Sequence, residues 1–249
     1  MSIVLTEDRG SARHIILNRP DKRNSFNAEL VQATGAALLA AANDPAVRVV
    51  VIRGEGKVFS AGMDLQELAS LSDSPHRLRE FRRECIVAWN IAEEMTKPTI
   101  AQLHGGCFGG ATELALACDM RVVAEGTRIS IPEVKLGLIP DVGGSSRLPS
   151  VVGLGRAKEL IMTGREFDAE EAFRIGFANR VAPEADLDAA TAELVEQLTA
   201  AFAVPVGLAK RVMDAAAKPA LAQTLEQEVT AQEVAVAALA AQMRAARQT

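Results

Sequence analysis

Several residue types are scarce in this 249-residue chain, and each scarcity narrows what the protein can be. Tyrosine is absent and aromatic residues make up only 4% of the chain, so no tyrosine can act in catalysis and small side chains must fill much of the core. The three cysteines, Cys85, Cys107 and Cys118, show no CxxC spacing and no accompanying histidine cluster. Their spacing argues against a metal site and predicts reduced thiols in a cytoplasmic protein.

Long apolar runs and a one-sided charge distribution are also missing. No stretch of about 18 uncharged apolar residues occurs, and the first twenty residues lack the pattern of a signal peptide, so neither a membrane span nor secretion is expected. Lysine and arginine are scattered, and the net charge is -5, which leaves no basic surface for nucleic acid. A content of 49% hydrophobic and 24% charged residues is typical of a soluble globular protein.

The chain does contain an alternation of short β-branched runs and helical patterns. The runs lie at residues 3–6, 14–18, 48–53, 99–103, 120–123 and 128–131. Residues 27–42 show helical spacing after a candidate N-cap, Asn27, and Ser74 with Pro75 begins a second helical pattern that ends before Pro98. This order of elements predicts an α/β fold.

The composition changes near residue 186, where alanine, glutamate, leucine and glutamine become frequent. We therefore divide the chain into a core, residues 1–186, and a helical C-terminal region, residues 187–249, with helices interrupted by Pro205 and Pro219. The last helix carries an apolar stripe formed by Leu221, Leu225, Val229, Val236, Leu239 and Met243. A stripe of that length packs either on its own domain or on another subunit.

Two glutamates follow turns marked by glycine or proline. Residues 104–119, HGGCFGGATELALACD, place Gly109 and Gly110 before a helical pattern that contains Glu113, and Glu133 follows Pro132 twenty residues later. Free N–H groups at the start of that helix could face a substrate oxygen, because no side chain blocks the approach. Taken alone, each glutamate would be an ordinary surface carboxylate, but together they suggest an oxyanion site with acid/base groups.

Three segments resemble the crotonase, or enoyl-CoA hydratase/isomerase, superfamily. They are FSAGMDLQEL (59–68), HGGCFGGATELALACD (104–119) and IPEVKLGLIPDVGGSSRLP (131–149), and the similarity extends through residues 18–27 and 204–216. The resemblance implies a crotonase-like ββα spiral core whose helical C-terminal region serves in oligomerisation and covers the active site. It also implies a homotrimer or a dimer of trimers.

The same resemblance implies roles for four positions. The backbone N–H groups of Met63 and Gly110 would hold the thioester oxygen of an acyl-CoA, Glu113 would orient a water molecule, and Glu133 would carry out the main proton transfer. The implied activity is that of an enoyl-CoA hydratase, which adds water reversibly and with syn geometry to a trans-2-enoyl-CoA. Two carboxyl groups that share one water should also share a proton at neutral pH.

Coenzyme A enters as part of the substrate, so no separate cofactor is expected. By resemblance, Lys22 and Arg23 would contact its phosphates, and Ala61, Asp64 and Leu65 would surround its adenine. Gly109 belongs to the glycine-rich turn over which the ligand passes. Lys210 is a further phosphate candidate that could reach a neighbouring subunit's ligand, although any one of these basic residues taken alone would be a solvated surface charge.

Asp141 departs from the hydratase pattern, in which glycine is common at this position. Its spacing of eight residues from Glu133 resembles that of the family's dienoyl-CoA isomerases, so Glu113, Glu133 and Asp141 could instead convert a 3,5-dienoyl-CoA to its 2,4-isomer. Asp141 could also simply cap the turn before Gly143. A third reading is a non-catalytic acyl-CoA-binding protein, which the presence of both glutamates argues against.

Overall fold

A computed structural model describes residues 2–71 and 74–246. Residue 1, residues 72–73 and residues 247–249, which end the expected C-terminal region, lie outside the described residues. The larger sheet has six strands in the order β1-β2-β3-β4-β6-β8. Their bounds are Val4–Arg9 (β1), Ala12–Leu17 (β2), Val49–Gly54 (β3), Thr99–Leu103 (β4), Met120–Ala124 (β6) and Arg180–Ala182 (β8). Five of these coincide with β-branched runs, whereas β8 had no sequence signal.

The first two strands form an antiparallel hairpin, with Val4 opposite Leu17, and every later neighbour in the larger sheet is parallel. Parallel neighbours require crossover connections, which helices supply. The crossovers use α1 (Ala28–Asn43) between β2 and β3, α2 (Leu65–Leu71) and α3 (Pro75–Glu94) between β3 and β4, and α4 (Gly110–Ala117) between β4 and β6. The predicted caps are confirmed, because Asn27 accepts from Leu30 N and Ser74 accepts from Arg77 N.

A second, smaller sheet turns this alternation into a spiral. It pairs β5 (Gly106–Phe108) with β7 (Arg128–Ser130) in parallel and is extended by isolated bridges from Ser60 to Cys107 and from Ile129 to Phe167. One turn of the spiral consists of a strand in each sheet followed by a helix, namely β4, β5 and α4. The turn before it has the same order, with β3, the bridge at Ser60, and then α2 and α3. This is the expected crotonase-like arrangement.

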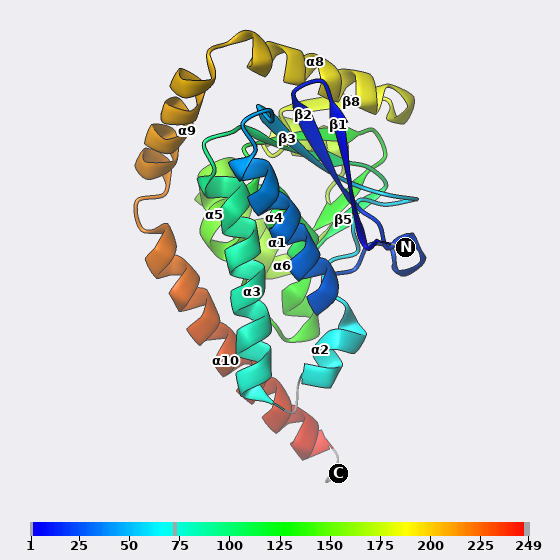
Figure 1. Ribbon diagram of the computed structural model, residues 1–249. Helices are drawn as coiled ribbons and strands as arrows, with labels where there is room; N and C mark the ends of the chain where they lie inside the picture. Colours follow the sequence, from blue (N-terminus) through cyan, green and yellow to red (C-terminus); the bar gives the residue numbers. More distant parts are fainter. Residues whose placement is uncertain (1, 72–73, 247–249) are drawn as a thin grey trace.

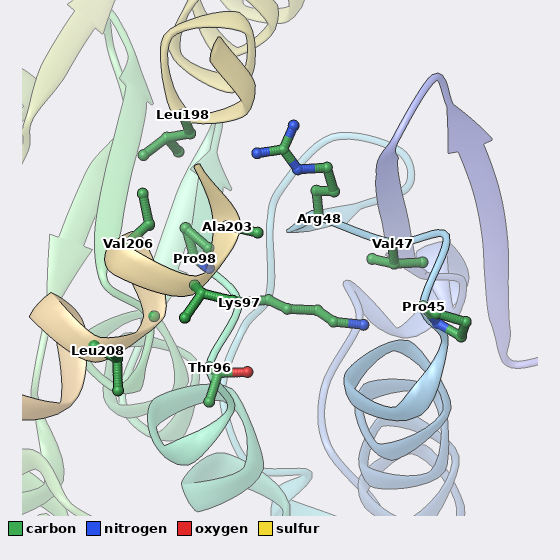
Figure 2. A pocket seen from close by; sticks show the side chains of 12 residues that line it. Pro45, Val47, Arg48, Thr96, Lys97, Pro98, Leu198, Ala203, Val206 and Leu208 are labelled. Carbon is green, nitrogen blue, oxygen red and sulfur yellow. The ribbon is translucent and has the colours of Figure 1, made fainter. Parts of the chain in front are cut away.

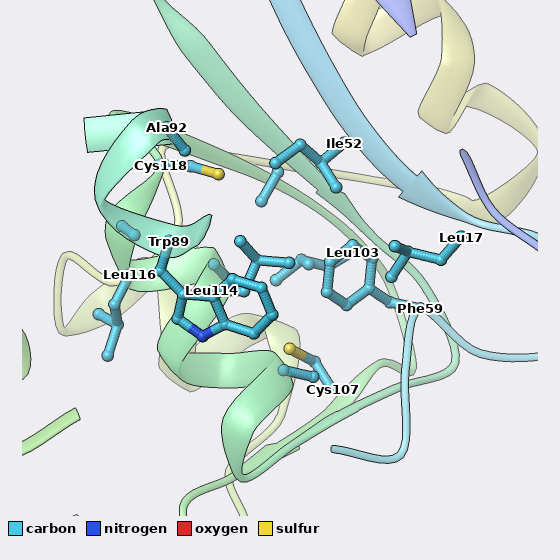
Figure 3. Packing of buried hydrophobic residues seen from close by; sticks show 14 of the residues in the cluster. Leu17, Ile52, Phe59, Trp89, Ala92, Leu103, Cys107, Leu114, Leu116 and Cys118 are labelled. Atoms are coloured by element: carbon cyan, nitrogen blue, oxygen red, sulfur yellow. The ribbon is translucent and has the colours of Figure 1, made fainter. Parts of the chain in front are cut away.

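Helices cover both faces of the larger sheet (Figure 1). On one face, α1 and α3 pack on a core that includes Trp89, whose ring meets Phe26 edge to face with centroids 5.0 Å apart. Figure 3 shows Trp89 beside Leu114 and Leu103 in this core, with the thiol of Cys107 buried nearby. The other face packs on α8 (Leu187–Ala200).

Four shorter elements complete the core. Glu133–Leu136 form a 3-10 helix, η2, and α5 (Gly144–Val152), α6 (Leu154–Thr163) and α7 (Ala169–Arg174) follow it before the last strand. All three cysteines are buried. They are also free of disulfides in the described residues, which agrees with the reduced thiols predicted from the sequence. No single helix in the described residues is long and apolar enough to cross a membrane; the bent pair formed by residues 184–200 and 203–217 passes that test only jointly.

The C-terminal region is helical, as predicted. Pro205 lies in the first turn of α9 (Ala203–Ala217), and Pro219 lies between α9 and α10 (Leu221–Ala246). Helix α10 runs back along α3, where Arg79 bonds Glu233 at 2.5 Å (Figure 1). Leu225 is buried in the chain's own fold, while Met243 is 53% exposed, so the stripe packs on its own domain except near its end.

Candidate active site

One cavity of about 410 Å³ collects most of the residues predicted for the site. Its walls come from segment 61–69, from α3, from the glycine-rich turn at 108–110, from segment 132–142 and from α10. Glu113, Glu133 and Asp141 are all on the wall, with Met63 and Gly110. Segments that are spread over residues 61–239 therefore meet here, because the spiral stacks its turns and α10 packs beside them. The volume falls within the range of small-molecule sites.

The two predicted oxyanion donors lie side by side. A Cβ placed on Gly62 would lie 2.4 Å from the carbonyl oxygen of Phe108 and 3.5 Å from the amide nitrogen of Gly110, so the two segments are in direct contact. Gly110 is the first residue of α4, and its N–H has no acceptor within the helix. Neither this N–H nor that of Met63 donates a hydrogen bond to any described residue. Two main-chain donors are thus available at the cavity wall.

Glu113 is held in place by the turn that precedes α5. Its side chain belongs to a residue only 1% exposed, and its Oε1 accepts hydrogen bonds from Val142 N at 3.1 Å and Gly144 N at 2.7 Å. Burial raises the pKa of this carboxyl well above its ordinary value, and the charges of Glu133, Asp141 and Glu228 raise it further. A solvated helix carboxylate, the simpler interpretation of Glu113, is therefore excluded.

Glu133 begins the short helix η2 and reaches back to the glycine-rich turn. A Cβ on Gly109 would lie 2.6 Å from its Oε1, so only glycine leaves room for the carboxylate. Its Oε2 is buried and has no hydrogen-bond partner in the described residues. Burial, with a smaller contribution from Asp141, raises the pKa of Glu133 to about 7. This carboxyl can consequently give or take a proton near neutral pH.

Asp141 does not cap the turn that follows it, so that interpretation of the sequence is wrong. The amides of Val142 and Gly144 bond Glu113, and the amide of Gly143 bonds Glu228. Asp141 instead forms an ion pair with Arg82 of α3, and both side chains are largely buried. Burial raises the pKa of Asp141 to about 6, although the Arg82 guanidinium opposes that rise. The cavity thus holds a third titratable acid.

Helix α10 brings two polar residues to this region that were not predicted from the sequence. Glu228 is buried and accepts hydrogen bonds from Gly143 N at 2.8 Å, Ser146 N at 2.5 Å and Ser146 Oγ at 2.6 Å. Burial raises its pKa to about 7. Gln232, on the cavity wall, accepts from Ile139 N at 2.7 Å. A signal was present, since both lie at helical spacing from Leu225 within the predicted apolar stripe.

The residues expected to bind coenzyme A are only partly near the cavity. Lys22 ends a short 3-10 helix, Pro20–Lys22, and both it and the following Arg23 are exposed. The Arg23 carbonyl accepts from Ala61 N at 2.9 Å, and Leu65 is 64% exposed at the cavity rim. Asp64 is different, because its carboxylate pairs with Arg19 at 2.6 Å and accepts from the first amides of α2. Its side chain therefore fixes the loop and is not free for a ligand.

The Lys210 ammonium, predicted as a phosphate ligand, is engaged within its own chain. Its residue is only 6% exposed, and its ammonium pairs with Asp119 at 2.9 Å and donates to the carbonyl oxygens of Ala92 at 3.0 Å and Lys97 at 3.2 Å. An ammonium has three N–H donors, and all three are used. The side chain joins α9 to α3 and the loop before β4, and in this position it offers no free donor to a phosphate.

A second hollow, of about 350 Å³, lies between the loop at 45–48, the loop at 96–98 and the start of α9. Figure 2 shows Arg48 and Lys97 along its edges. Both cations are engaged by main-chain carbonyls, Arg48 with Thr199 O at 2.7 Å and Lys97 with Ala41 O at 2.6 Å. It contains none of the predicted site residues. Across residues 2–71 and 74–246, no group of three or more metal-ligating side chains is arranged to hold a metal ion.

Comparison with known proteins agrees with this geometry. Residues 7–246 match a family model described as enoyl-CoA hydratase/isomerase. The chain is 37% identical over 227 residues to a protein of Rhizobium meliloti named probable enoyl-CoA hydratase, a match that spans 90% of this chain and 86% of the relative. It is 38% identical over 212 residues to the carnitinyl-CoA dehydratase of Salmonella typhi, a match that spans 85% of this chain and 79% of the relative. The crystal structure of an enoyl-CoA hydratase from Bacillus halodurans superimposes with a TM-score of 0.88 at 26% identity and covers 94% and 95% of the two chains.

Proposed function

Because the chain belongs to the enoyl-CoA hydratase/isomerase family, we propose that it is an enoyl-CoA hydratase acting on a trans-2-enoyl-CoA. One observation carries this proposal: two buried carboxyl groups, Glu113 and Glu133, share a cavity with two backbone N–H donors that have no acceptor in the described residues. Acid/base groups beside an oxyanion site are what hydration of an unsaturated thioester requires.

The oxyanion donors lower the barrier by binding charge that forms during the reaction. As water adds at C3, electrons move onto the thioester oxygen, and the N–H groups of Met63 and Gly110 stabilise the resulting enolate. Each such donor contributes on the order of 3 kcal/mol in comparable sites. The position of Gly110 at the start of α4 adds the favourable end of the helix dipole.

The two glutamates divide the proton transfers. Glu113 as carboxylate accepts a proton from water while the water oxygen bonds to C3, and protonated Glu133 delivers a proton to C2. Burial and the neighbouring acids raise the pKa of Glu113, but its two amide donors favour the charged form and oppose that rise. The buried Oε2 of Glu133 has no donor in the described residues, so we place the shared proton on Glu133. A proton then returns from Glu113 to Glu133, and the reverse sequence dehydrates the product.

Coenzyme A is bound as part of the substrate in this proposal. Lys22 and Arg23 are free of ion pairs in the described residues and would meet its phosphates, and the loop at Ala61 and Leu65 would surround the adenine. The reaction moves protons and a hydroxyl group only, so its chemistry calls for neither a metal nor a redox cofactor. A cytoplasmic location is part of the same proposal.

The test is a direct assay of the purified protein with crotonyl-CoA, with formation of 3-hydroxybutyryl-CoA measured by mass spectrometry. A hydratase will give that product and will also dehydrate it when supplied with it. Binding of acyl-CoA without conversion of any enoyl or dienoyl thioester would show a non-catalytic acyl-CoA-binding protein instead.

A specific observation favours a second candidate, 3,5- to 2,4-dienoyl-CoA isomerisation. Asp141 lies on the wall of the same cavity as Glu113 and Glu133 and plays no part in the neighbouring turn. Incubation with a 3,5-dienoyl-CoA distinguishes the two activities. An isomerase will lose that turnover in Asp141→Asn, while a hydratase will show little dienoyl turnover in either protein.

We also propose that the chain assembles as a homotrimer or a dimer of trimers through α9. This helix and the residue before it expose a run of large apolar side chains, namely Phe202, Val204, Leu208, Val212 and Met213. Contiguous apolar surface of this kind marks protein interfaces. Light scattering during gel filtration measures the assembly, and Leu208→Glu with Val212→Glu will shift it to smaller species if α9 forms the contact.

A further inference from the structure

Arg82 is a buried cation on the wall of the catalytic cavity. Its side chain is 6% exposed, it projects from α3, and it is the one basic residue among those that line the cavity. Desolvating a guanidinium is costly, and the ion pair with Asp141 compensates for only part of its hydrogen-bonding capacity. The remaining wall on this side is apolar, with Leu78 and Phe81 from the same helix.

The terminal nitrogens of Arg82 have no acceptor. The ion pair runs through Nε, and neither terminal nitrogen donates a hydrogen bond to any residue in the described part of the chain. A guanidinium carries five N–H donors, so four of them are left for a ligand or water. The side-chain nitrogen of Gln232 also has no acceptor in the described residues, since the hydrogen bond of this side chain with Ile139 N uses its carbonyl oxygen.

The chain's other buried guanidinium groups each have several acceptors. Arg147 bonds Glu93, Asn90 and the carbonyl oxygen of Val142. Arg121 bonds the carbonyl oxygens of Phe177, Ala115 and Cys118. Arg82 differs from both because it lines the cavity and has only one acceptor in the described residues, the carboxylate of Asp141. Polar groups at such sites are normally hydrogen-bonded, so an acceptor that arrives with the substrate can complete the hydrogen bonding of Arg82.

We propose that Arg82 and Gln232 select an enoyl-CoA whose acyl chain carries an oxygen acceptor beyond C3, a hydroxyl or a carboxylate, over an enoyl-CoA with a plain alkyl chain. This inference rests on the proposed function, since it assigns the substrate class of the same cavity. The apolar residues from α2 and α3 hold the intervening methylene groups, and the planar fork of Arg82 binds the oxygen.

The opposing charges fit this arrangement. Glu113, Glu133 and Asp141 are the acids on the cavity wall, and Asp141 already neutralises much of the charge of Arg82. A neutral hydroxyl therefore enters without further repulsion, whereas a carboxylate gains a bidentate bond but meets the nearby acids. Both ligands use the same donors, and comparison of the two shows which one the site prefers.

The experiment compares thioesters of matched length. We would measure kcat/KM for trans-2-hexenoyl-CoA, for its analogue with a hydroxyl in place of the terminal methyl group, and for the corresponding ω-carboxyl compound. Affinities for the three saturated analogues come from calorimetry, which needs no turnover. The variants are Arg82→Lys and the double substitution Arg82→Met with Asp141→Asn, which removes the pair without leaving an uncompensated buried charge.

We expect the parent protein to prefer one oxygenated chain by at least about tenfold in both kcat/KM and affinity, because an alkyl chain displaces water from the donors of Arg82 without supplying an acceptor. The double variant will reduce that ratio to about one, and Arg82→Lys will fall between. Equal or better use of the alkyl chain by the parent, or a ratio that survives in the double variant, overturns the inference. If no enoyl thioester is hydrated but the affinity ratio holds, the proposed function fails and this selectivity stands; if no acyl-CoA binds, both fail.

Discussion

Glu113 and Glu228 accept hydrogen bonds from neighbouring amides of one turn, Glu113 from Gly144 N at 2.7 Å and Glu228 from Gly143 N at 2.8 Å. One acid belongs to α4 of the core, and the other belongs to the C-terminal helix α10. The turn that orients a proposed catalytic carboxylate is therefore fixed from both sides. Arg147 also stabilises the turn by donating a hydrogen bond to the carbonyl oxygen of Val142.

Substitution of Glu228 should impair catalysis through this turn. In Glu228→Gln one amide oxygen must replace two carboxylate oxygens, and the new NH₂ group faces an N–H donor of Gly143 or Ser146. We expect a loss of about 1–3 kcal/mol in the free energy of unfolding. Because Glu113 loses its fixed orientation, kcat for hydration will fall while affinity for a saturated acyl-CoA changes little.

The matched control is Glu226→Gln, which alters an exposed carboxylate two residues away on the same helix. It should retain parental stability and kcat. Steady-state kinetics, calorimetric affinity and thermal unfolding together separate positioning from a general loss of structure. A normal kcat in folded Glu228→Gln would show that α10 does not act on Glu113.

Replacement of Glu133 should remove proton transfer without removing binding. Glu133→Gln keeps the size of the side chain but cannot deliver a proton to C2, so we expect kcat to fall by about 10²–10⁴. Affinity for a saturated acyl-CoA should persist, since the oxyanion donors are main-chain groups. Glu196→Gln, an exposed change on α8, is the control, and hydration at the parental rate by Glu133→Gln would disprove the assignment.

The position of Glu133 depends on Gly109, whose backbone conformation few other residue types adopt. Gly109 has φ +52° and ψ -125°, and a Cβ there would lie 2.6 Å from Glu133 Oε1. Gly109→Ala should therefore cost on the order of 1–3 kcal/mol in backbone strain and displace the carboxylate. We expect lower stability together with a large loss of kcat.

Gly126→Ala provides the comparison for that variant. Gly126 has φ +76°, but a Cβ there would meet nothing within 4 Å. Both substitutions strain the backbone, and only the one at Gly109 touches the site. Gly126→Ala should thus lose stability but keep kcat, measured by thermal unfolding and the hydration assay. Equal losses of kcat in the two variants would show that strain alone, and not the displaced carboxylate, causes the effect.

Much of the fold could be predicted because its determinants are local. Every β-branched run became a strand, and Asn27 and Ser74 cap the helices they were expected to cap. Strands β5 and β8 escaped prediction because each has three residues and exists only through its pairing with a distant strand. Helices α5 to α7 escaped because they are short, with 9, 10 and 6 residues.

The acidic residues of the site could be predicted from sequence motifs. The residues that bond or pair with them could not, because those contacts depend on tertiary packing. Nothing near Lys210 in the sequence indicates Asp119 as its partner, so its burial could not be foreseen. Asp141 pairs with Arg82 across 59 residues. Glu228 and Gln232 could have been predicted, because polar residues at helical spacing from Leu225 lie within the apolar stripe and require buried partners.

The acid cluster should make stability depend on pH in a defined direction. Glu133 has a pKa of about 7 in the folded protein against an ordinary value of 4.5, so the folded state holds a proton that the unfolded state releases. Its contribution is present in full below the unfolded pKa and is lost as the pH rises through about 7. Glu133→Gln cannot lose a proton, so its free energy of unfolding should rise relative to the parent by about 1–3 kcal/mol between pH 5 and pH 8. Denaturant unfolding across that range measures the difference, with Glu196→Gln expected to follow the parent. A difference independent of pH would mean that Glu133 is already ionised in the folded protein at pH 5, and the proton proposed to reach C2 would then have to come from another group.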